Sequence, residues 1–242
     1  MTLQETMAEL ERLGSEQTRK TYGRHGATPP MFGVSYADIG KLTKRIKRDQ
    51  ALADGLWATG NLDARILATM IADPASFSPA KIEAWLSGLR YHGLIDELTS
   101  RIAAKNPVAR AVMERWTASD DEHVGRAGWV LLSQLAADEA STLPDAFFEE
   151  RLATIEAQIH GAPNRKRQAM NLAMVSVGGR NERLRKLAIA AAKRVGPVEI
   201  DHGDTSCKTV DAVEYIGKMW AQREKAPPAA KAPSAAAKRK AK

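Results

Sequence analysis

The residues of this chain whose types and spacing best suit chemistry lie in the segment Tyr91-His92-Gly93-Leu94-Ile95-Asp96. Two flat side chains, Tyr91 and His92, precede the Asp96 carboxylate by about one helical turn. A carboxylate held close to aromatic faces can stabilise a positive charge that develops on a bound molecule. A carboxylate in the first turn of a helix can equally be an ordinary partner of the helix dipole. The segment therefore indicates either a cation-stabilising site or a plain helix start.

Two amphipathic helices must position this segment. The apolar face of the first ends at Trp85, Leu86 and Leu89. The next apolar face starts at Leu94 and continues with Ile95, Leu98 and Ile102, which is helical spacing. We therefore expect Tyr91-His92-Gly93 to be a connector, and Asp96 to lie in the first turn of the second helix, on the side away from Leu98.

Capping signals mark further helices along the chain. Thr2 with Glu5, and Ser119 with Glu122, have the spacing of a capping box, and Ser78-Pro79 is a typical helix start. Gly196-Pro197 is a typical helix end. The glycine- and proline-rich stretch 22–34 is expected to be non-helical, after a short helix that ends near Lys20. The last helix is expected to start at Thr209.

The resulting pattern predicts an all-α protein. No stretch alternates long enough to build a sheet, and about ten helices of roughly 11 to 18 residues alternate with short loops. Helix pairs recur at roughly 35 to 45 residues, which favours a HEAT-like, ARM-type α-solenoid of antiparallel helix pairs. A plain helical bundle remains the alternative.

The positive charge of the chain is concentrated at its C-terminal end. The 242 residues contain 36 Lys and Arg against 29 Asp and Glu, but seven of these bases and only one acid lie after Ala221. We therefore expect two parts: a folded domain over 1–221 and a disordered, basic Ala/Pro/Lys tail over 222–242. Because the body is almost neutral, a basic surface on it requires segregation of charge rather than excess.

Composition also excludes several classes. No run of 18 apolar residues occurs, so no membrane span is expected, and the N-terminal residues lack an apolar signal segment. The single cysteine, Cys207, excludes an internal disulfide and a multi-cysteine zinc site. The stretch 201–208 offers metal-binding types at no standard spacing, and we expect it to shape a turn. A cytoplasmic monomer without metal or cofactor is the expectation.

Two basic clusters are candidates for anion binding. The first, Arg165-Lys166-Arg167, lies in the first turn of a helix, where positive charge is unfavourable to the dipole and so suggests an anionic partner such as phosphate. The second consists of Lys41, Lys44 and Arg45. Both clusters can also be solvated helix faces. Four tryptophans at helical core spacing are expected to pack inside: Trp57, Trp85, Trp116 and Trp129.

Several short motifs, in order and spacing, resemble those of the bacterial DNA alkylation repair family, which are HEAT-repeat DNA glycosylases that remove cationic alkylpurines. The resemblance covers about residues 20 to 220. The motifs are Tyr22-Gly23, Phe32-Gly33-Val34, Leu56-Trp57, Ala64-Arg65, the Asp96 segment, His123-Val124-Gly125-Arg126-Ala127 and Arg167-Gln168-Ala169-Met170-Asn171.

This resemblance implies roles for two residues. Asp96 matches the family's catalytic aspartate, which stabilises the charge that moves onto deoxyribose as the glycosidic bond breaks. Arg126 matches an arginine that lies near the DNA backbone beside that aspartate. Three tryptophans of the family pattern are replaced, by His92, His123 and Leu172. His92 would repel a cationic base if it were protonated. The C-terminal runs 178–181 and 198–205 indicate a distinct subgroup.

The resemblance leaves three functions open. The chain would bind damaged or distorted duplex DNA and excise N3- or N7-alkylpurines, with Asp96 as the catalytic residue. The second possible function is binding of distorted or branched DNA without catalysis, as the replaced tryptophans suggest. The third possible function is that of a helical protein-binding scaffold, as the almost neutral charge of residues 1–221 suggests. The expected DNA contacts are Tyr91, His92, Arg126, Arg165, Lys166, Arg167, Lys41, Lys44 and Arg45.

Overall fold

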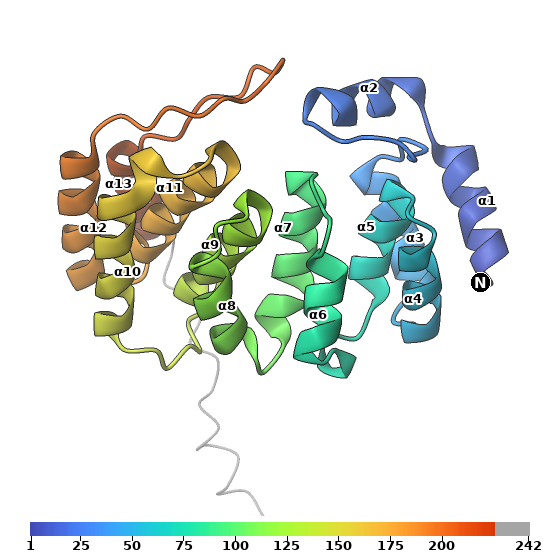
Figure 1. Ribbon diagram of the computed structural model, residues 1–242, viewed down its shortest axis with the longest axis horizontal. Helices are drawn as coiled ribbons and strands as arrows, with labels where there is room; N and C mark the ends of the chain where they lie inside the picture. Colours follow the sequence, from blue (N-terminus) through green and yellow to red (C-terminus); the bar gives the residue numbers. More distant parts are fainter. Residues whose placement is uncertain (226–242) are drawn as a thin grey trace, which may run out of the picture.

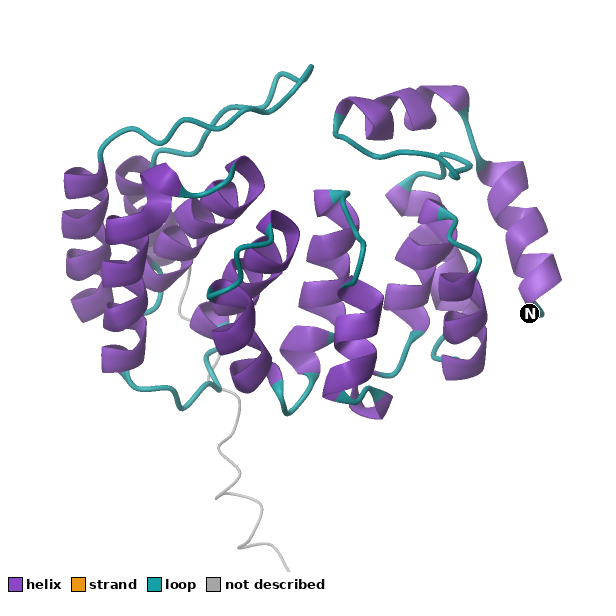
Figure 2. Cartoon of the chain, in the orientation of Figure 1, coloured by secondary structure: helices purple, strands orange, loops and turns teal. Residues whose placement is uncertain are grey.

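The computed structural model describes residues 1–225, which contain thirteen α-helices, three 3₁₀ turns and no strand (Figure 2). The all-α prediction is therefore confirmed for this part of the chain. The α-helices are α1 (Leu3–Leu13), α2 (Glu16–Arg24), α3 (Tyr36–Ile46), α4 (Gln50–Ala58), α5 (Leu62–Ile71), α6 (Pro79–Leu86), α7 (His92–Arg101), α8 (Ala109–Thr117), α9 (Glu122–Ala137), α10 (Asp145–Gln158), α11 (Asn164–Gly178), α12 (Glu182–Val195) and α13 (Ala212–Lys225).

The helices form a HEAT-like α-solenoid, as predicted. They stand side by side in a row, and each pair packs on its neighbours: α5 on α7, α7 on α9, and α9 on α11 (Figure 1). A plain bundle would bring the two ends of the chain onto one shared core, whereas here the core extends along the row. The helices have 8 to 16 residues, somewhat shorter than expected.

Most helix starts follow their capping signals. Thr2 and Glu5 form the expected capping box, and Ser78 caps α6 with Pro79 at its first position. The predicted capping box at Ser119 is wrong, because the Asp121 carboxylate accepts the hydrogen bonds of the His123 and Val124 N–H groups and so caps α9. The Ser119 hydroxyl instead accepts a hydrogen bond from the backbone N–H of Asp121, two residues later in the chain.

The start of α7 also differs from the expectation. The helix begins at His92, so Gly93 lies within it, and Tyr91 is the N-cap without a side-chain hydrogen bond. Asp96 is therefore the fifth residue of α7 and lies in its second turn, which corrects its placement in the first. The dipole effect falls off within the first turn, so the plain helix-start interpretation loses support.

Three other segments were predicted wrongly. The α2 helix continues through Arg24, beyond Lys20, and α4 was not predicted as a separate helix. The last helix starts at Ala212 rather than Thr209, because the Asp211 carboxylate accepts from the Glu214 N–H at its first turn. This helix runs to Lys225, past the predicted domain boundary at 221; the predicted disorder of 226–242 lies outside the described residues.

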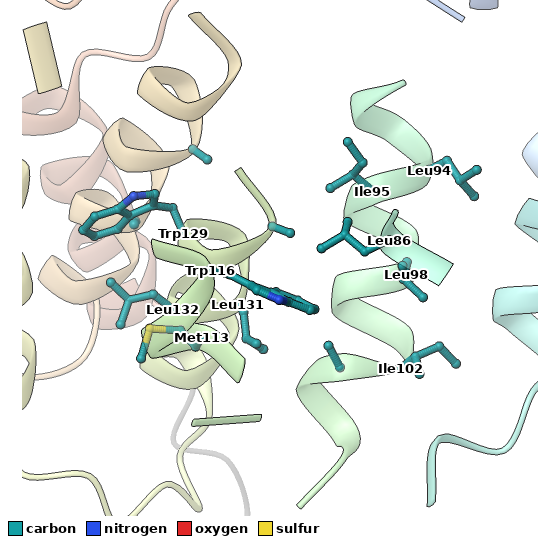
Figure 3. Packing of buried hydrophobic residues seen from close by; sticks show 14 of the residues in the cluster. Leu86, Leu94, Ile95, Leu98, Ile102, Met113, Trp116, Trp129, Leu131 and Leu132 are labelled. Carbon is teal, nitrogen blue, oxygen red and sulfur yellow. The ribbon is translucent and has the colours of Figure 1, made fainter. Parts of the chain in front are cut away.

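The core confirms the packing interpretation of the tryptophans, all four of which are buried. Trp57 and Trp85 are stacked with ring centroids 4.0 Å apart. Trp116 and Trp129 lie among Met113, Leu131 and Leu132 between α8, α9 and their neighbours (Figure 3). No described helix is long and apolar enough to cross a membrane.

Two segments project on the same side of the row, beyond the upper ends of α7 and α9 in Figure 1. One is α2, and the other is the non-helical stretch 197–211, drawn in orange. The fully buried Asp63 holds the loop that follows α2, because its carboxylate accepts hydrogen bonds from the backbone N–H groups of Phe32, Gly33 and Val34. The ends of α7 and α9 therefore lie between the two projections, and the loop that follows α2 is held in place by Asp63.

Candidate functional site

A bidentate ion pair between Asp96 of α7 and Arg126 of α9 lies at the centre of the predicted site. The Arg126 Nε and Nη2 atoms donate to the two Asp96 carboxylate oxygens at 2.8 and 2.6 Å. The Arg126 side chain is 3% exposed, while that of Asp96 is 37% exposed. The pair is therefore anchored on the buried guanidinium, and the carboxylate is the member that faces solvent.

Arg126 also bonds to α11. Its Nη1 atom donates to the Gln168 amide oxygen at 3.0 Å and to the Arg165 carbonyl at 3.2 Å. The Glu122 carboxylate of α9 accepts a hydrogen bond from the Arg165 backbone N–H at 2.5 Å. These bonds join the N-terminal halves of α7, α9 and α11. We call Tyr91, His92, Asp96, Arg126 and Arg165 the Asp96 surface.

His92 is neutral at physiological pH. Burial lowers the pKa of its imidazole to about 3, with smaller contributions from the Arg126 and Arg165 guanidinium groups. The His25 and Tyr91 rings lie beside it, with centroids 6.3 and 5.3 Å away. His92 therefore does not repel a cation by charge, but an imidazole offers a smaller π-face than the tryptophan of the family pattern.

Tyr91 and His123 complete the surroundings of His92. Burial raises the pKa of the Tyr91 phenol, whose ring lies 6.3 Å from that of Tyr22. Burial lowers the pKa of the His123 imidazole, and its Nδ1 atom is buried without a hydrogen-bond partner in the described residues. The aromatic side chains near Asp96 are thus histidines and tyrosines, and the family's tryptophans are replaced.

The structure separates the members of the 165–167 cluster. Only Arg165 lies at the Asp96 surface. Lys166 is buried, and its ammonium donates to the Ser119 carbonyl at 2.8 Å. Arg167 donates to the carbonyls of Ala162 and Glu199, and so holds the start of the 197–211 stretch. In this arrangement both cations bind the protein's own backbone.

The second basic cluster lies elsewhere, on α3, which packs against α5 (Figure 1). Lys41 pairs with Asp38 at 2.8 Å, and Arg45 lies 4.0 Å from Glu9. Lys44 has no ion pair among the described residues. The predicted site residues therefore form two groups, and only the group around Asp96 is joined by direct bonds.

Gln168 is a site residue that the sequence reasoning missed. It follows Arg165 by one helical turn, which was the available signal, and its amide oxygen accepts from Arg126. Leu172, one turn further along α11, is 37% exposed and stands where the family pattern has a tryptophan. No group of three potential metal ligands occurs among residues 1–225. In the 201–208 stretch, the Asp201 carboxylate accepts from the Gly203 N–H and shapes the turn.

The all-α solenoid of paired helices places the chain in the class of HEAT-like repeat proteins. The chain belongs to the DNA alkylation repair enzyme family, whose model matches residues 6–216. The predicted family resemblance is thereby confirmed.

Its relatives include proteins of uncharacterised function. Lin0241 of Listeria innocua and Lmo0209 of Listeria monocytogenes are each 28% identical over 225 residues, which cover 90% of this chain and 97% of each relative. A solved structure with a TM-score of 0.84 is 32% identical and covers 92% of this chain and 95% of its own. It represents a new family of proteins related to the HEAT-like repeat DNA glycosylases with affinity for branched DNA structures.

Proposed function

We propose that this protein binds branched or distorted duplex DNA at the Asp96 surface without breaking a glycosidic bond. The Asp96–Arg126 ion pair carries this proposal. Both carboxylate oxygens accept from one guanidinium at 2.6 and 2.8 Å, so the negative charge has a full counter-charge beside it. A carboxylate in this state stabilises a developing sugar cation much less than a free one does, because the two fields oppose each other.

The aromatic side chains support the same reading. Excision of a cationic base gains from aromatic faces that stabilise its charge. Here His92 and Leu172 replace two of those faces, and the neutral His92 supplies a π-face smaller than an indole. Two of the aromatic faces that would stabilise a cationic base are thus absent, while Asp96 and Arg126, which join α7 to α9, are present.

DNA binding is supported by the arrangement of the helices. The N-terminal halves of α7, α9 and α11 meet at this surface. Asp121 and Glu122 occupy the N-terminus of α9, whereas the first turns of α7 and α11 contain no acidic residue and favour anions such as phosphate. Arg165 adds a cation there. The solved relative with affinity for branched DNA shares the fold along most of its length, so a similar substrate class is the one we propose for this chain.

Excision of alkylpurines is the second candidate function. The observation that favours it is the exposure of Asp96, whose side chain is 37% accessible at the surface. If a DNA phosphate took over part of the hydrogen bonding of Arg126, the Asp96 carboxylate would be released to face the deoxyribose. This route keeps the role that the family resemblance implies for both residues.

The test measures binding and base release on the same preparation. A four-way junction, a linear duplex of equal length and base composition, and a duplex with N7-methylguanine are each titrated at several salt concentrations. Freed bases are separated chromatographically. We expect tighter binding of the junction than of the linear duplex, and no base release above the spontaneous rate.

An Asp96→Asn variant serves as the control, because it keeps the shape of the side chain and one oxygen acceptor for Arg126 but removes the negative charge. Base release that is lost in this variant would replace the binding proposal with the excision candidate. Equal affinity for junction and linear duplex would remove the structural specificity, and no DNA binding at all would leave the scaffold function.

A further inference from the structure

A cavity of about 200 Å³ opens beside Tyr91, on the opposite side of α7 from the Asp96–Arg126 pair. It is enclosed by the loop at Thr28–Pro30, the start of α5 and the connector between α6 and α7. Figure 1 shows α7 between α5 and α9, and α7 packs on both. The cavity lies on the α5 side, while Arg126 of α9 approaches Asp96 from the other side.

Arg65 of α5 lines this cavity without an acidic partner. Its Nε atom donates to the Trp57 carbonyl at 3.2 Å, and its guanidinium lies 5.2 Å from the centre of the Trp57 ring. No carboxylate lies within ion-pair distance of it in residues 1–225, and burial lowers its pKa. The protein thus holds a partly buried cation in a fixed position with its terminal nitrogens free of a counter-charge.

The remaining lining adds positive charge and no negative charge. Arg90 is 64% exposed and lies 3.6 Å from the Asp121 carboxylate, which is outside the cavity. Neither aspartate nor glutamate lines the cavity. Its volume is several times the roughly 30 Å³ share of one water molecule, so a phosphate group has room to enter.

We propose that this cavity, which we call the Arg65 pocket, binds a phosphate group of the DNA backbone. The inference rests on the proposed function for the identity of the ligand. Guanidinium groups match phosphate geometry through paired N–H donors, and an arginine fixed on an aromatic ring is already ordered for such a bond. DNA would then be held on both sides of α7, at the Arg65 pocket and at the Asp96 surface.

The first test is the salt dependence of DNA binding by Arg65→Gln. Loss of one phosphate contact lowers the slope of log affinity against log salt by about 0.9 for duplex DNA. We expect that change, with roughly tenfold weaker binding at 0.1 M salt, for the junction. Arg65→Lys keeps the positive charge but loses the paired N–H donors of the guanidinium. Its affinity for the junction should therefore lie between that of the parent and that of Arg65→Gln.

Arg110→Gln is the matched control. The Arg110 guanidinium also lies over an aromatic ring, at 5.1 Å from the centre of Phe147, but it is paired with Glu114 at 3.1 Å. This variant should keep the slope of the parent. Arg90 also lines the pocket, but its side chain is exposed, so that Arg90→Gln should fold normally even if the Arg65 variants do not. This variant should also lower the slope of log affinity against log salt.

The second test uses inorganic phosphate, which separates the pocket from the DNA. In NMR spectra the backbone N–H resonance of Tyr91, which lines the pocket, should shift saturably with phosphate in the parent and in Arg110→Gln, but not in Arg65→Gln. Phosphate binding without DNA binding would keep the pocket and refute the proposed function. Junction binding whose slope in Arg65→Gln equals that of the parent would overturn the pocket proposal alone, as would a parent that shows no phosphate response.

Discussion

At the scale of single residues, the Asp96–Arg126 pair is asymmetric. Arg126 is almost inaccessible, whereas Asp96 meets solvent. Removal of Asp96 should therefore destabilise the fold by a different amount than removal of Arg126. Without Arg126, the Asp96 carboxylate can still be hydrated. Without Asp96, a guanidinium remains buried with only a carbonyl and an amide oxygen as partners.

We expect Asp96→Ala to lower the free energy of unfolding by about 3 kcal/mol, because it leaves a buried charge without its counter-charge. The double variant Asp96→Ala/Arg126→Met should recover most of that loss. Urea denaturation of both single variants and the double variant forms a complete cycle. A double variant as unstable as the sum of the single variants would show that the two residues do not act as a pair.

Protonation of His92 gives a second prediction. Its pKa is about 3 in the folded protein and is near 6.5 in an unfolded chain. Between these values the unfolded chain binds a proton that the folded protein does not, so the stability falls as pH decreases from 6.5 toward 3. His123 acts in the same direction.

In His92→Gln, the melting temperature should therefore fall less between pH 6.5 and 4 than in the parent. Tyr91→Phe is the control, since it alters a neighbouring ring but removes no group that titrates in this range, and it should follow the parent. Identical pH profiles for parent and His92→Gln would mean that the imidazole is protonated in the folded protein.

The sequence predicted Asp96, His92 and Arg126 as site residues but did not predict how they contact one another. Asp96 and Arg126 are 30 residues apart, and their pairing depends on the packing of α7 on α9. Lys166 illustrates the limit. Its position in the first turn of α11 suggested a phosphate, yet its ammonium donates to the Ser119 carbonyl, in the connection between α8 and α9, at 2.8 Å. No sequence pattern places that carbonyl.

At the scale of elements, the backbones of α8 and α9 approach each other closely at Gly128. A Cβ atom at Gly128 would lie 2.4 Å from the Thr117 backbone nitrogen and 2.6 Å from the Trp116 carbonyl carbon. Only a residue without a side chain allows this spacing. The two helices of this repeat therefore have a fixed separation, which in turn sets where Arg126 stands.

Gly128→Ala should cost about 2 to 3 kcal/mol, because backbone atoms of α8 cannot yield as a flexible side chain can. Gly40→Ala is the matched control within α3, where a Cβ would have no neighbour within 4 Å. It should gain about 0.5 to 1 kcal/mol from helix propensity. Equal effects in thermal unfolding of the two variants would refute the close approach.

Helix existence was more predictable than helix ends. Periodic apolar residues predicted the helices, whereas each helix start depends on which polar side chain accepts the hydrogen bonds of the first-turn N–H groups. At α9 the Asp121 carboxylate caps the helix in place of Ser119, and at α13 Asp211 does so in place of Thr209. Two neighbouring polar residues are often both good caps, and only three-dimensional geometry decides between them.

At the scale of the whole molecule, the solenoid could be predicted because its repeats are local. The two projections could not, since α2 and the 197–211 stretch come from opposite ends of the chain and share a side only in the folded array (Figure 1). The body also carries almost no net charge. The proposed DNA binding by the body therefore requires positioned cations such as Arg65 and Arg165 in place of overall electrostatic attraction.

A chain ended after Lys225 tests this separation. The residues removed, 226–242, contain five bases and no acid. Their loss should weaken binding of junction and linear duplex by the same factor and lower both salt slopes, because tail contacts with phosphate are sequence- and structure-independent. The junction preference should remain. A preference that vanishes with these residues would locate recognition outside the solenoid.

The bonds of Arg126 also set an order of events during synthesis. Its partners lie 30 residues before it, on Asp96, and 39 and 42 residues after it, on Arg165 and Gln168. A nascent chain that has released α9 but not α11 can form the Asp96 pair and must leave the third guanidinium nitrogen to water. Because solenoid repeats fold on their neighbours, the Asp96 surface is completed only when α11 leaves the ribosome.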